Sequence, residues 1–374
     1  MQVKAIASIL AVALLALAGC PASRAPLRAR VESAVIAAGR PVGPVSLLAG
    51  GGSLFAVFSD WETTSLAVCE VPIGPRLPPS IASPRLIDKV DVAPPLSPSF
   101  GEHACAASSG SLAVLYLDRE REDKSVLKLA TRAVGASSAS STSSAVQWRL
   151  DILEPAGGPL ALLVEPDGRM ACFWAAGSVF FRDASGAQGI LRDALQPGSR
   201  ALGFAAGDTR GFTVFDQSTR QLVWYRWTGG ELAHGVVAEA GPVHAPTMSV
   251  DEAGVVRLAV ASYDPSKRRI YFFRETDETG SFSRITVTMA DGTRSLFCAP
   301  WNGGFLFLYD ETRPLGGGKS ACDLSLLAPV GARYQKVALS TGSAPLLDLS
   351  AVLLDGALYV LALRQELALL RVEL

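Results

Sequence analysis

The stretch Leu258-Ala-Val-Ala-Ser-Tyr-Asp264, followed by the turn Asp264-Pro-Ser-Lys-Arg268 and by Ile270-Tyr-Phe-Phe-Arg274, decides the fold class of this chain. Its two flanking parts are rich in aromatic and β-branched residues, which are typical of strands. A glycine-marked turn, Glu252-Ala-Gly254, precedes them, and the more polar segment Phe282-Ser-Arg-Ile-Thr-Val287 follows. The pattern predicts the second, third and fourth strands of one antiparallel sheet.

The same unit recurs along the whole chain. Glycines at positions 52, 110, 168, 207, 254, 303 and 356 mark the turns, and successive ones lie 39 to 58 residues apart. Short runs of small and apolar residues precede these turns, and a stronger strand follows each one. The stronger strands are Phe55–Asp60, Leu112–Asp118, Met170–Trp174, Phe212–Asp216, Leu258–Asp264, Phe305–Asp310 and Leu358–Leu363.

Four antiparallel strands repeated about every 50 residues predict an all-β fold, a β-propeller of about seven four-stranded blades. The last unit, which begins near Leu349, has only three strands before Leu374. We expect residues 27–36 to supply its fourth strand, because an open blade would expose a sheet edge. Six or eight blades are alternatives. A β-sandwich or two stacked domains would not explain seven similar units.

Residues 249–287 resemble a blade of the sialidase-like propellers. Tyr263-Asp264 ends the second strand, and Thr276-Asp-Glu-Thr-Gly-Ser-Phe282 resembles a degenerate Asp-box at the turn between the third and fourth strands. A full Asp-box has tighter spacing and a tryptophan. The resemblance implies the fold and carries no catalytic implication, because Asp-boxes brace turns away from the active face.

The beginning of the chain contains a second resemblance. Lys4 precedes a 13-residue apolar run, Ala5–Leu17, and Leu17-Ala-Gly-Cys20 ends it. About 20 apolar residues are needed to span a bilayer, so this run is too short to be a membrane helix. The pattern resembles the lipobox of bacterial lipoproteins, which implies cleavage before Cys20 and acylation of that cysteine. An ordinary secretory signal is the alternative.

The lipobox resemblance implies how the chain is divided and where it is located. We expect a signal peptide at 1–19, a lipidated tether at 20–26 and the propeller at 27–374. More than one acyl chain gives stable membrane anchoring. Because Pro21 follows Cys20 in place of an aspartate, the family's sorting rule favours the outer membrane of the bacterial envelope.

Composition excludes several classes of function. Without residues 1–19, 33 basic residues face 35 acidic ones, which argues against a nucleic-acid partner. Five cysteines remain beside Cys20, with no C-x-x-C spacing, and we expect most of them to be small buried residues. The chain has three histidines. These counts predict no metal and no cofactor.

Five of the predicted second strands end in aspartate. In a propeller, the loops between second and third strands, and those between blades, gather on one face around the central channel. A ring of carboxylates there would suit a hard cation such as calcium or a basic group. The alternative is that each aspartate caps its own hairpin, and repetition in most blades favours this alternative. The residues are Asp60, Asp118, Asp216, Asp264 and Asp310.

Departures from the repeat are better candidates for a ligand site, because a functional site usually breaks a repeat. Aromatic, histidine, arginine and glutamate side chains are expected at the channel mouth, where they would recognise a sugar or a peptide. For each residue the alternative is packing or ordinary solvation. The candidates are Trp61, Glu102, His103, Trp174, Arg200, His244 and Arg294.

Three segments are predicted to be insertions between strands. Glu311–Ser320, with three consecutive glycines, predicts a long mobile loop on the same face. Its Gly-Lys-Ser does not match a phosphate-binding loop, because the earlier glycine and the following helix are missing. Pro75–Pro84 and the Ser/Ala-rich segment Gly135–Ala145 predict flexible loops on the opposite face.

Two functions follow as hypotheses. The first is a non-enzymatic, membrane-anchored lipoprotein whose propeller binds a protein or glycan at the cell envelope. The outer-membrane barrel-assembly machinery uses a lipoprotein of this general architecture, although its tryptophan-anchored repeats are absent here. The alternative is a sialidase-like glycoside hydrolase, which implies three arginines, a Tyr–Glu pair and an acidic Asp. Arg200 and Arg294 occupy suitable positions, but no third arginine and no Tyr–Glu pair is identifiable.

Overall fold

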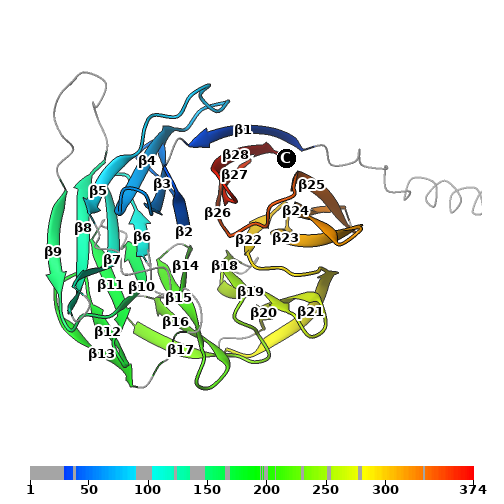
Figure 1. Cartoon of the computed structure of the whole chain (residues 1–374). Coiled ribbons are helices and arrows are strands. Elements are labelled where there is room, and N and C mark those ends of the chain that lie inside the picture. Colours follow the sequence, from blue (N-terminus) through cyan, green and yellow to red (C-terminus); the bar gives the residue numbers. More distant parts are fainter. Residues whose placement is uncertain are drawn as a thin grey trace, which may run out of the picture.

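The chain forms a closed ring of seven antiparallel sheets around a central axis (Figure 1). The computed structural model describes residues 29–36, 39–89, 103–121, 124–134, 148–164, 169–193, 195, 197, 201–206, 208–228, 231–250, 254–276, 280–331 and 333–374. These residues form 28 strands, four in each sheet. None of them belongs to a helix long and apolar enough to cross a bilayer. The prediction of a seven-bladed β-propeller is confirmed.

Each blade consists of four strands that follow one another in the chain, except the last, which takes its outermost strand from the N-terminal part. From innermost to outermost strand, the blades are β2 (Pro41–Gly50), β3 (Ser53–Asp60), β4 (Ser65–Pro72), β5 (Arg85–Lys89); β6 (His103–Ala107), β7 (Ser111–Arg121), β8 (Lys124–Ala133), β9 (Arg149–Leu153); β10 (Gly158–Val164), β11 (Met170–Ala175), β12 (Ser178–Arg182), β13 (Gln188–Asp193); β14 (Leu202–Ala206), β15 (Thr209–Asp216), β16 (Gln221–Thr228), β17 (Glu231–Val237); β18 (His244–Val250), β19 (Val256–Asp264), β20 (Arg269–Glu275), β21 (Phe282–Met289); β22 (Leu296–Trp301), β23 (Gly304–Gly316), β24 (Lys319–Val330), β25 (Arg333–Gly342); and β26 (Asp348–Leu354), β27 (Ala357–Leu363), β28 (Leu367–Glu373), β1 (Arg30–Ile36).

The second strands are continuous apolar runs because both of their faces are buried between blades. In β27, Tyr359 and Leu361 pack in the apolar cluster shared with the first blade, whereas Leu358 and Val360 pack in the cluster shared with the sixth. Alternate side chains of a strand point to opposite faces, so one strand serves two clusters. Seven such clusters lie between neighbouring blades, and we call each of them a seam.

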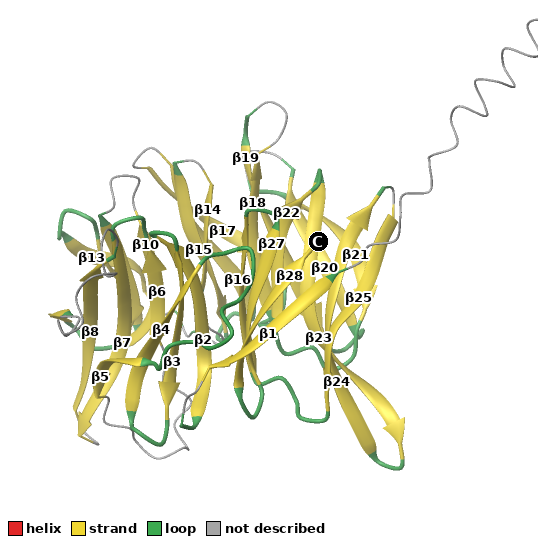
Figure 2. Ribbon diagram, turned by 90° about the horizontal axis from the view of Figure 1, so that it is seen from above, coloured by secondary structure: helices red, strands yellow, loops and turns green. Residues whose placement is uncertain are grey.

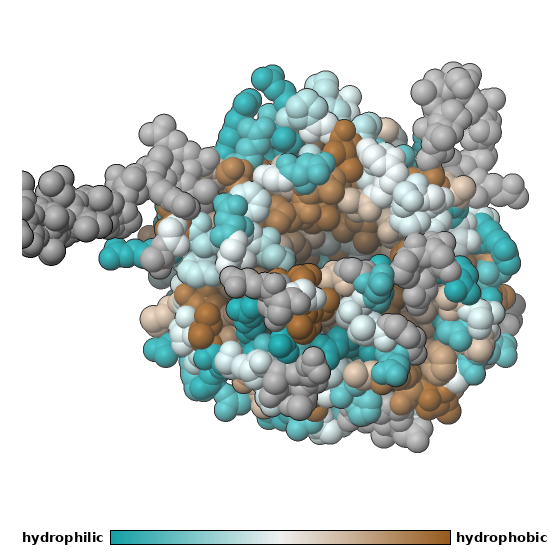
Figure 3. All heavy atoms as spheres, turned by 180° about the vertical axis from the view of Figure 1, so that it is seen from behind, coloured by the Kyte–Doolittle hydropathy of each residue, from teal (hydrophilic) through white to brown (hydrophobic). Residues whose placement is uncertain are grey.

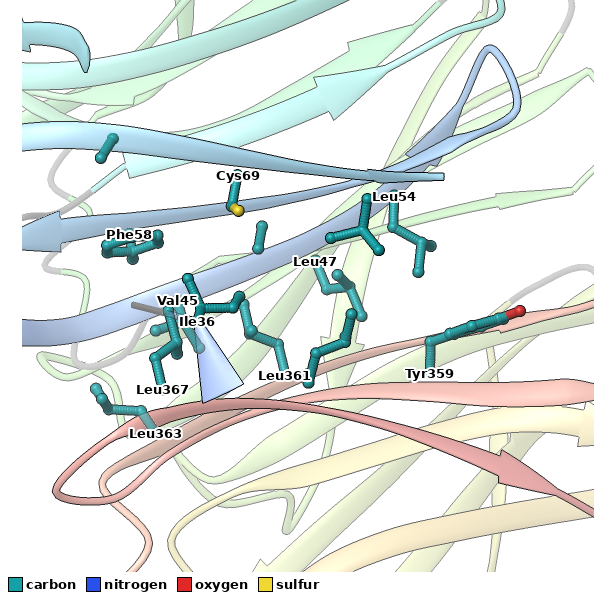
Figure 4. Packing of buried hydrophobic residues seen from close by; sticks show 14 of the residues in the cluster. Ile36, Val45, Leu47, Leu54, Phe58, Cys69, Tyr359, Leu361, Leu363 and Leu367 are labelled. Atoms are coloured by element: carbon teal, nitrogen blue, oxygen red, sulfur yellow. The ribbon is translucent and has the colours of Figure 1, made fainter. Parts of the chain in front are cut away.

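The ring is closed by the N-terminal strand, as predicted. β1 pairs antiparallel with β28 along its whole length, from Arg30 opposite Glu373 to Ile36 opposite Leu367. Ile36 is buried in the seam between the seventh and first blades, beside Val45 and Leu367 (Figure 4). The pairing covers the edge of β28 that would otherwise be open to other strands.

The inner strands of the same two blades are joined by side chains. The Asp348 carboxylate accepts a hydrogen bond from the Val45 N–H at 2.8 Å, and the Ser350 hydroxyl accepts one from the Leu47 N–H at 2.9 Å. The innermost strand of a propeller blade has a free backbone edge, and here β26 satisfies part of that edge for β2.

The segment Glu311–Ser320 is not a loop, so that prediction is wrong. It extends β23 and β24 into a paired hairpin whose turn, Gly316 to Gly318, has positive φ angles. In Figure 2 this hairpin extends beyond the other loops on one side of the ring. By contrast, residues 73–84 contain no strand, in agreement with the predicted Pro75–Pro84 loop, and Gly135–Ala145 lies outside the described residues.

Candidate functional site

The face on which the second strands end carries the aspartates singled out in the sequence, and we call it the mouth face. Asp60 there accepts hydrogen bonds from the backbone N–H groups of Gly39, Arg40 and Glu62, at 3.1, 2.9 and 3.0 Å. Burial acts to raise the pKa of Asp60, but these donors hold it below its ordinary value. Asp310 accepts from the N–H groups of Arg294 and Ser295 at 2.8 Å each, and burial raises its pKa.

The other three aspartates also have close partners within the chain. Asp216 and Asp264 each accept hydrogen bonds from the serine two residues later, at 2.7 and 2.6 Å to the hydroxyl. Asp118 is buried and forms an ion pair with Lys128, whose ammonium also contacts Asp88 at 3.2 Å. The described residues contain no group of three or more His, Cys, Asp or Glu side chains placed to hold a metal ion.

Trp174 and the two candidate histidines lie inside the fold. Trp174 is fully buried, stacks on Phe180 at 5.9 Å between centroids and donates from its indole N–H to the Pro155 carbonyl at 2.8 Å. His103 is buried, and its Nε2 lies 3.1 Å from the Ser46 hydroxyl. The Trp174 ring belongs to the apolar cluster between the second and third blades, and the His103 contact joins the second blade to the first.

His244 begins the innermost strand of the fifth blade and is also buried. Its Nδ1 lies 3.0 Å from the Pro242 carbonyl. Burial lowers the pKa of His244 from 6.5 to about 4, against the hydrogen bonds to backbone that favour the charged form. The imidazole is therefore neutral at physiological pH.

Of the remaining candidates, Trp61 and Arg294 reach the surface of the mouth face. Trp61 is partly exposed, and its backbone N–H donates to the Arg40 carbonyl at 2.9 Å. The Arg294 side chain is exposed beside the buried Asp310. Glu102, Arg200 and the predicted lipidation site Cys20 lie outside the described residues.

A groove at the outer part of the mouth face was missed by the sequence analysis. It has a volume of about 280 Å³ and lies between the fifth blade and the extended β23–β24 hairpin. Arg268 and Met289 line it from the fifth blade, Asp291 from the connection between β21 and β22, and Glu311, Arg313 and Lys336 are among those that line it from the sixth.

Three ion pairs organise this groove. Arg268 binds Asp291 through both carboxylate oxygens, Lys336 binds Glu311, and the Arg313 Nε lies 2.9 Å from the Asp323 carboxylate. The Thr312 N–H donates to the Asp291 carbonyl at 2.7 Å, which fastens the base of the hairpin to the fifth blade. One sequence signal could have pointed to Arg268, because the turn Asp264–Arg268 recurs in the fourth blade as Asp216–Arg220. Arg220 and Arg268 both have positive φ angles. Asp291, its partner, lies in a connection without strand periodicity.

The opposite face presents a different surface. In the view from behind, its centre is hollowed and hydrophobic side chains line the hollow (Figure 3). The turn that carries the resemblance to an Asp-box lies between β20 and β21, where the Thr276 N–H donates to the Ser281 carbonyl at 2.8 Å. The residues between them, 277–279, lie outside the described part of the chain.

The cysteines in the described part of the chain are packing residues. Cys69, Cys105, Cys172, Cys298 and Cys322 form no disulfide with one another, and all but Cys105 are buried. Burial raises the pKa of Cys69 to about 11 and that of Cys172 to about 12, so these thiols stay protonated at physiological pH. They serve as small packing residues in the seams.

Comparison with known proteins places the chain by fold only. No family model and no curated protein matches it. Among solved structures, the Trypanosoma rangeli sialidase superposes with a TM-score of 0.51 at 14% identity, over 90% of this chain and 55% of the sialidase. A structure described as YCF48 bound to D1 peptide superposes with a TM-score of 0.51 at 11% identity, over 92% of this chain and 95% of the other. Likenesses at this identity show the fold alone. The chain spans about half the length of the sialidase.

Proposed function

We propose that this protein is a non-catalytic, lipid-anchored propeller that binds a partner protein at the bacterial cell envelope. The observation that carries the proposal is the extended β23–β24 hairpin with its charged groove. Its strands β23 and β24, of 13 and 12 residues, are the longest among the described residues, and it is exposed from Thr312 to Ser320. A rigid ring with one irregular, exposed edge suits recognition of another macromolecule.

The burial and the hydrogen bonds of the side chains that could act as acid or base support a non-catalytic function. A general acid or base must reach the substrate, but the imidazoles of His103 and His244 are buried. Asp60 and Asp310 are committed to backbone N–H groups. A protein partner is also supported by analogy, because one structure of similar fold was solved with a bound peptide.

The lipid anchor is tested by changing the expected acylation site. In the full-length chain, Cys20→Ser should move the protein from the membrane fraction to the soluble fraction, because no acyl chain can then be attached. Intact-mass measurement of the wild-type protein should show an N-terminal cysteine carrying diacylglycerol. An unmodified leader on the wild-type chain would contradict the anchor.

The binding function is tested by site-specific photo-cross-linking in cells that make the full chain. A cross-linker at position 315, on the hairpin, should capture one reproducible protein, whereas a cross-linker at position 152, an exposed residue of β9 in the second blade, should not. If position 315 yields no cross-linked protein that position 152 does not also yield, the proposal is wrong. So would turnover of a fluorogenic glycoside that Arg294→Ala abolishes, because this would show a sialidase-like active site.

A further inference from the structure

The groove between the fifth and sixth blades has an unequal distribution of charge between its depth and its surface. In each of its three ion pairs the cation is the more exposed partner: the side chains of Arg268, Lys336 and Arg313 are 63%, 43% and 53% exposed. Their carboxylate partners Asp291, Glu311 and Asp323 are 39%, 16% and 10% exposed. The surface that a ligand meets first is therefore cationic, although the pairs are balanced in formal charge.

The arginines retain hydrogen-bonding capacity beyond these pairs. A guanidinium has five N–H donors and holds a carboxylate with two of them. Arg268 uses Nε and Nη2 on Asp291, and Arg313 uses Nε on Asp323. Within the described part of the chain neither guanidinium makes another side-chain hydrogen bond, so each can donate to a second carboxylate.

Apolar surface lies beside these cations. Met289 in the groove is 64% exposed, and Leu315 on the hairpin is 54% exposed. An aliphatic side chain next to an acidic one would find both a cation and an apolar contact here. A small anion would use only the first of these.

We propose that the groove binds an extended acidic peptide segment of a partner protein, with its carboxylates on Arg268 and Arg313. The proposal rests on the proposed binding function and assigns a place and a chemistry to it. Lys336 supplies a third cation along the same groove, and Met289 contacts the aliphatic residues between the acidic ones.

The probe is a fluorescein-labelled peptide of sequence Ser-Glu-Leu-Glu-Ser-Glu-Leu-Glu-Ser, compared by fluorescence anisotropy with the same peptide carrying Gln for Glu. The acidic probe should bind saturably and weaken as salt rises, because exposed charges are screened. Arg268→Gln and Arg313→Gln should each weaken it about tenfold, the loss expected for one charge-assisted hydrogen bond.

The matched control is Arg149→Gln. Arg149 is an exposed arginine that pairs with Asp151 on β9, far from the groove in the ring (Figure 1). This variant should bind the acidic probe as the wild-type protein does. Thermal unfolding of Arg268→Gln and Arg149→Gln should match that of the wild type, since both pairs are at the surface. Arg313→Gln leaves the Asp323 carboxylate, which is 10% exposed, without its cation and should lower the unfolding temperature, so its binding is measured well below that temperature.

Several outcomes overturn the inference. These are equal affinity for the Glu and Gln probes, no binding of either, or the same loss in Arg149→Gln as in the groove variants. Pelleting with phosphatidylserine vesicles, lost in the groove variants while the peptide fails to bind, would assign the groove to a lipid headgroup instead. If the double variant Arg268→Gln, Arg313→Gln still captures the partner in cells, the proposed binding function is supported, but the groove is not the binding site.

Discussion

Single polar residues on the mouth face contribute mainly to the fold. Asp60 bonds the backbone that leads into the first blade, and Asp310 bonds the backbone that enters the sixth. Asp216 and Asp264 bond serines in their own hairpins. One residue type thus recurs because each blade must turn and connect at this face, and a carboxylate can satisfy several N–H donors there.

The buried imidazole of His244 should make stability depend on pH. Its pKa is about 4 in the folded protein and 6.5 as an ordinary value, so the unfolded chain binds the proton first as pH falls. Stability is full above pH 6.5 and decreases as pH falls towards 4. Between pH 7.5 and 4.5 the loss from this one group is about 2.5 kcal/mol.

Urea unfolding at these two pH values measures the effect. His244→Asn removes the titrating group, so the variant should lose about 2.5 kcal/mol less than the wild type on acidification. His234→Asn is the matched control, because His234 is exposed, and it should keep the wild-type dependence. Equal pH dependence in wild type and His244→Asn would contradict the prediction.

At the scale of elements, the second strands were predictable because the physics of a strand buried on both faces is simple. Phe212–Asp216 and Leu358–Leu363 fall within β15 and β27. Such a strand needs uninterrupted apolar and aromatic residues, and the sequence shows them directly. The closing strand was predictable as well, because a blade with three strands leaves an edge that requires a partner.

Other elements could not be read from the sequence. Glu311–Ser320 contains proline and three glycines, which favour a loop, yet a glycine turn can also end two long paired strands. Trp174 ends a strand near a predicted surface, but only packing shows whether its ring faces a neighbouring blade. The groove escaped prediction because Arg268 and Arg313 come together only when two blades are placed side by side.

The closing strand should contribute stability through one buried side chain. Ile36 is buried in the seam between the last and first blades, whereas its neighbour Val35 is 56% exposed. Ile36→Ala should lower the free energy of unfolding by about 2 to 5 kcal/mol, the usual loss for a buried aliphatic side chain. Val35→Ala should change it by less than about 0.5 kcal/mol.

Chemical denaturation of the two variants beside the wild type distinguishes these values. Unfolding of Ile36→Ala should also promote association at high protein concentration, because β28 then exposes its edge more often. Losses of equal size in the two variants would mean that β1 is not fixed in its observed register.

At the scale of the whole molecule, stability is distributed around a ring. Each blade shares its apolar faces with two neighbours, and ion pairs join some of the same blades: Arg132 with Glu70, and Arg226 with Glu275. Each apolar cluster of the described residues contains side chains from two neighbouring blades. A closed ring of shared seams should therefore unfold as one unit rather than blade by blade.

Hydrogen exchange tests this cooperativity. Phe58 is fully buried in the seam between the seventh and first blades, and Phe58→Ala should cost about 3 to 5 kcal/mol. If the ring opens only as a whole, the slowest amides of β3 should exchange at least about 100-fold faster in Phe58→Ala than in the wild type. The slowest amides of β15, on the other side of the ring, should be accelerated by the same factor. The matched control Ile152→Ala, at an exposed position, should leave both strands unchanged. Acceleration confined to the seventh and first blades would show that the seams open independently, since breaking one of them would then leave the far blades folded.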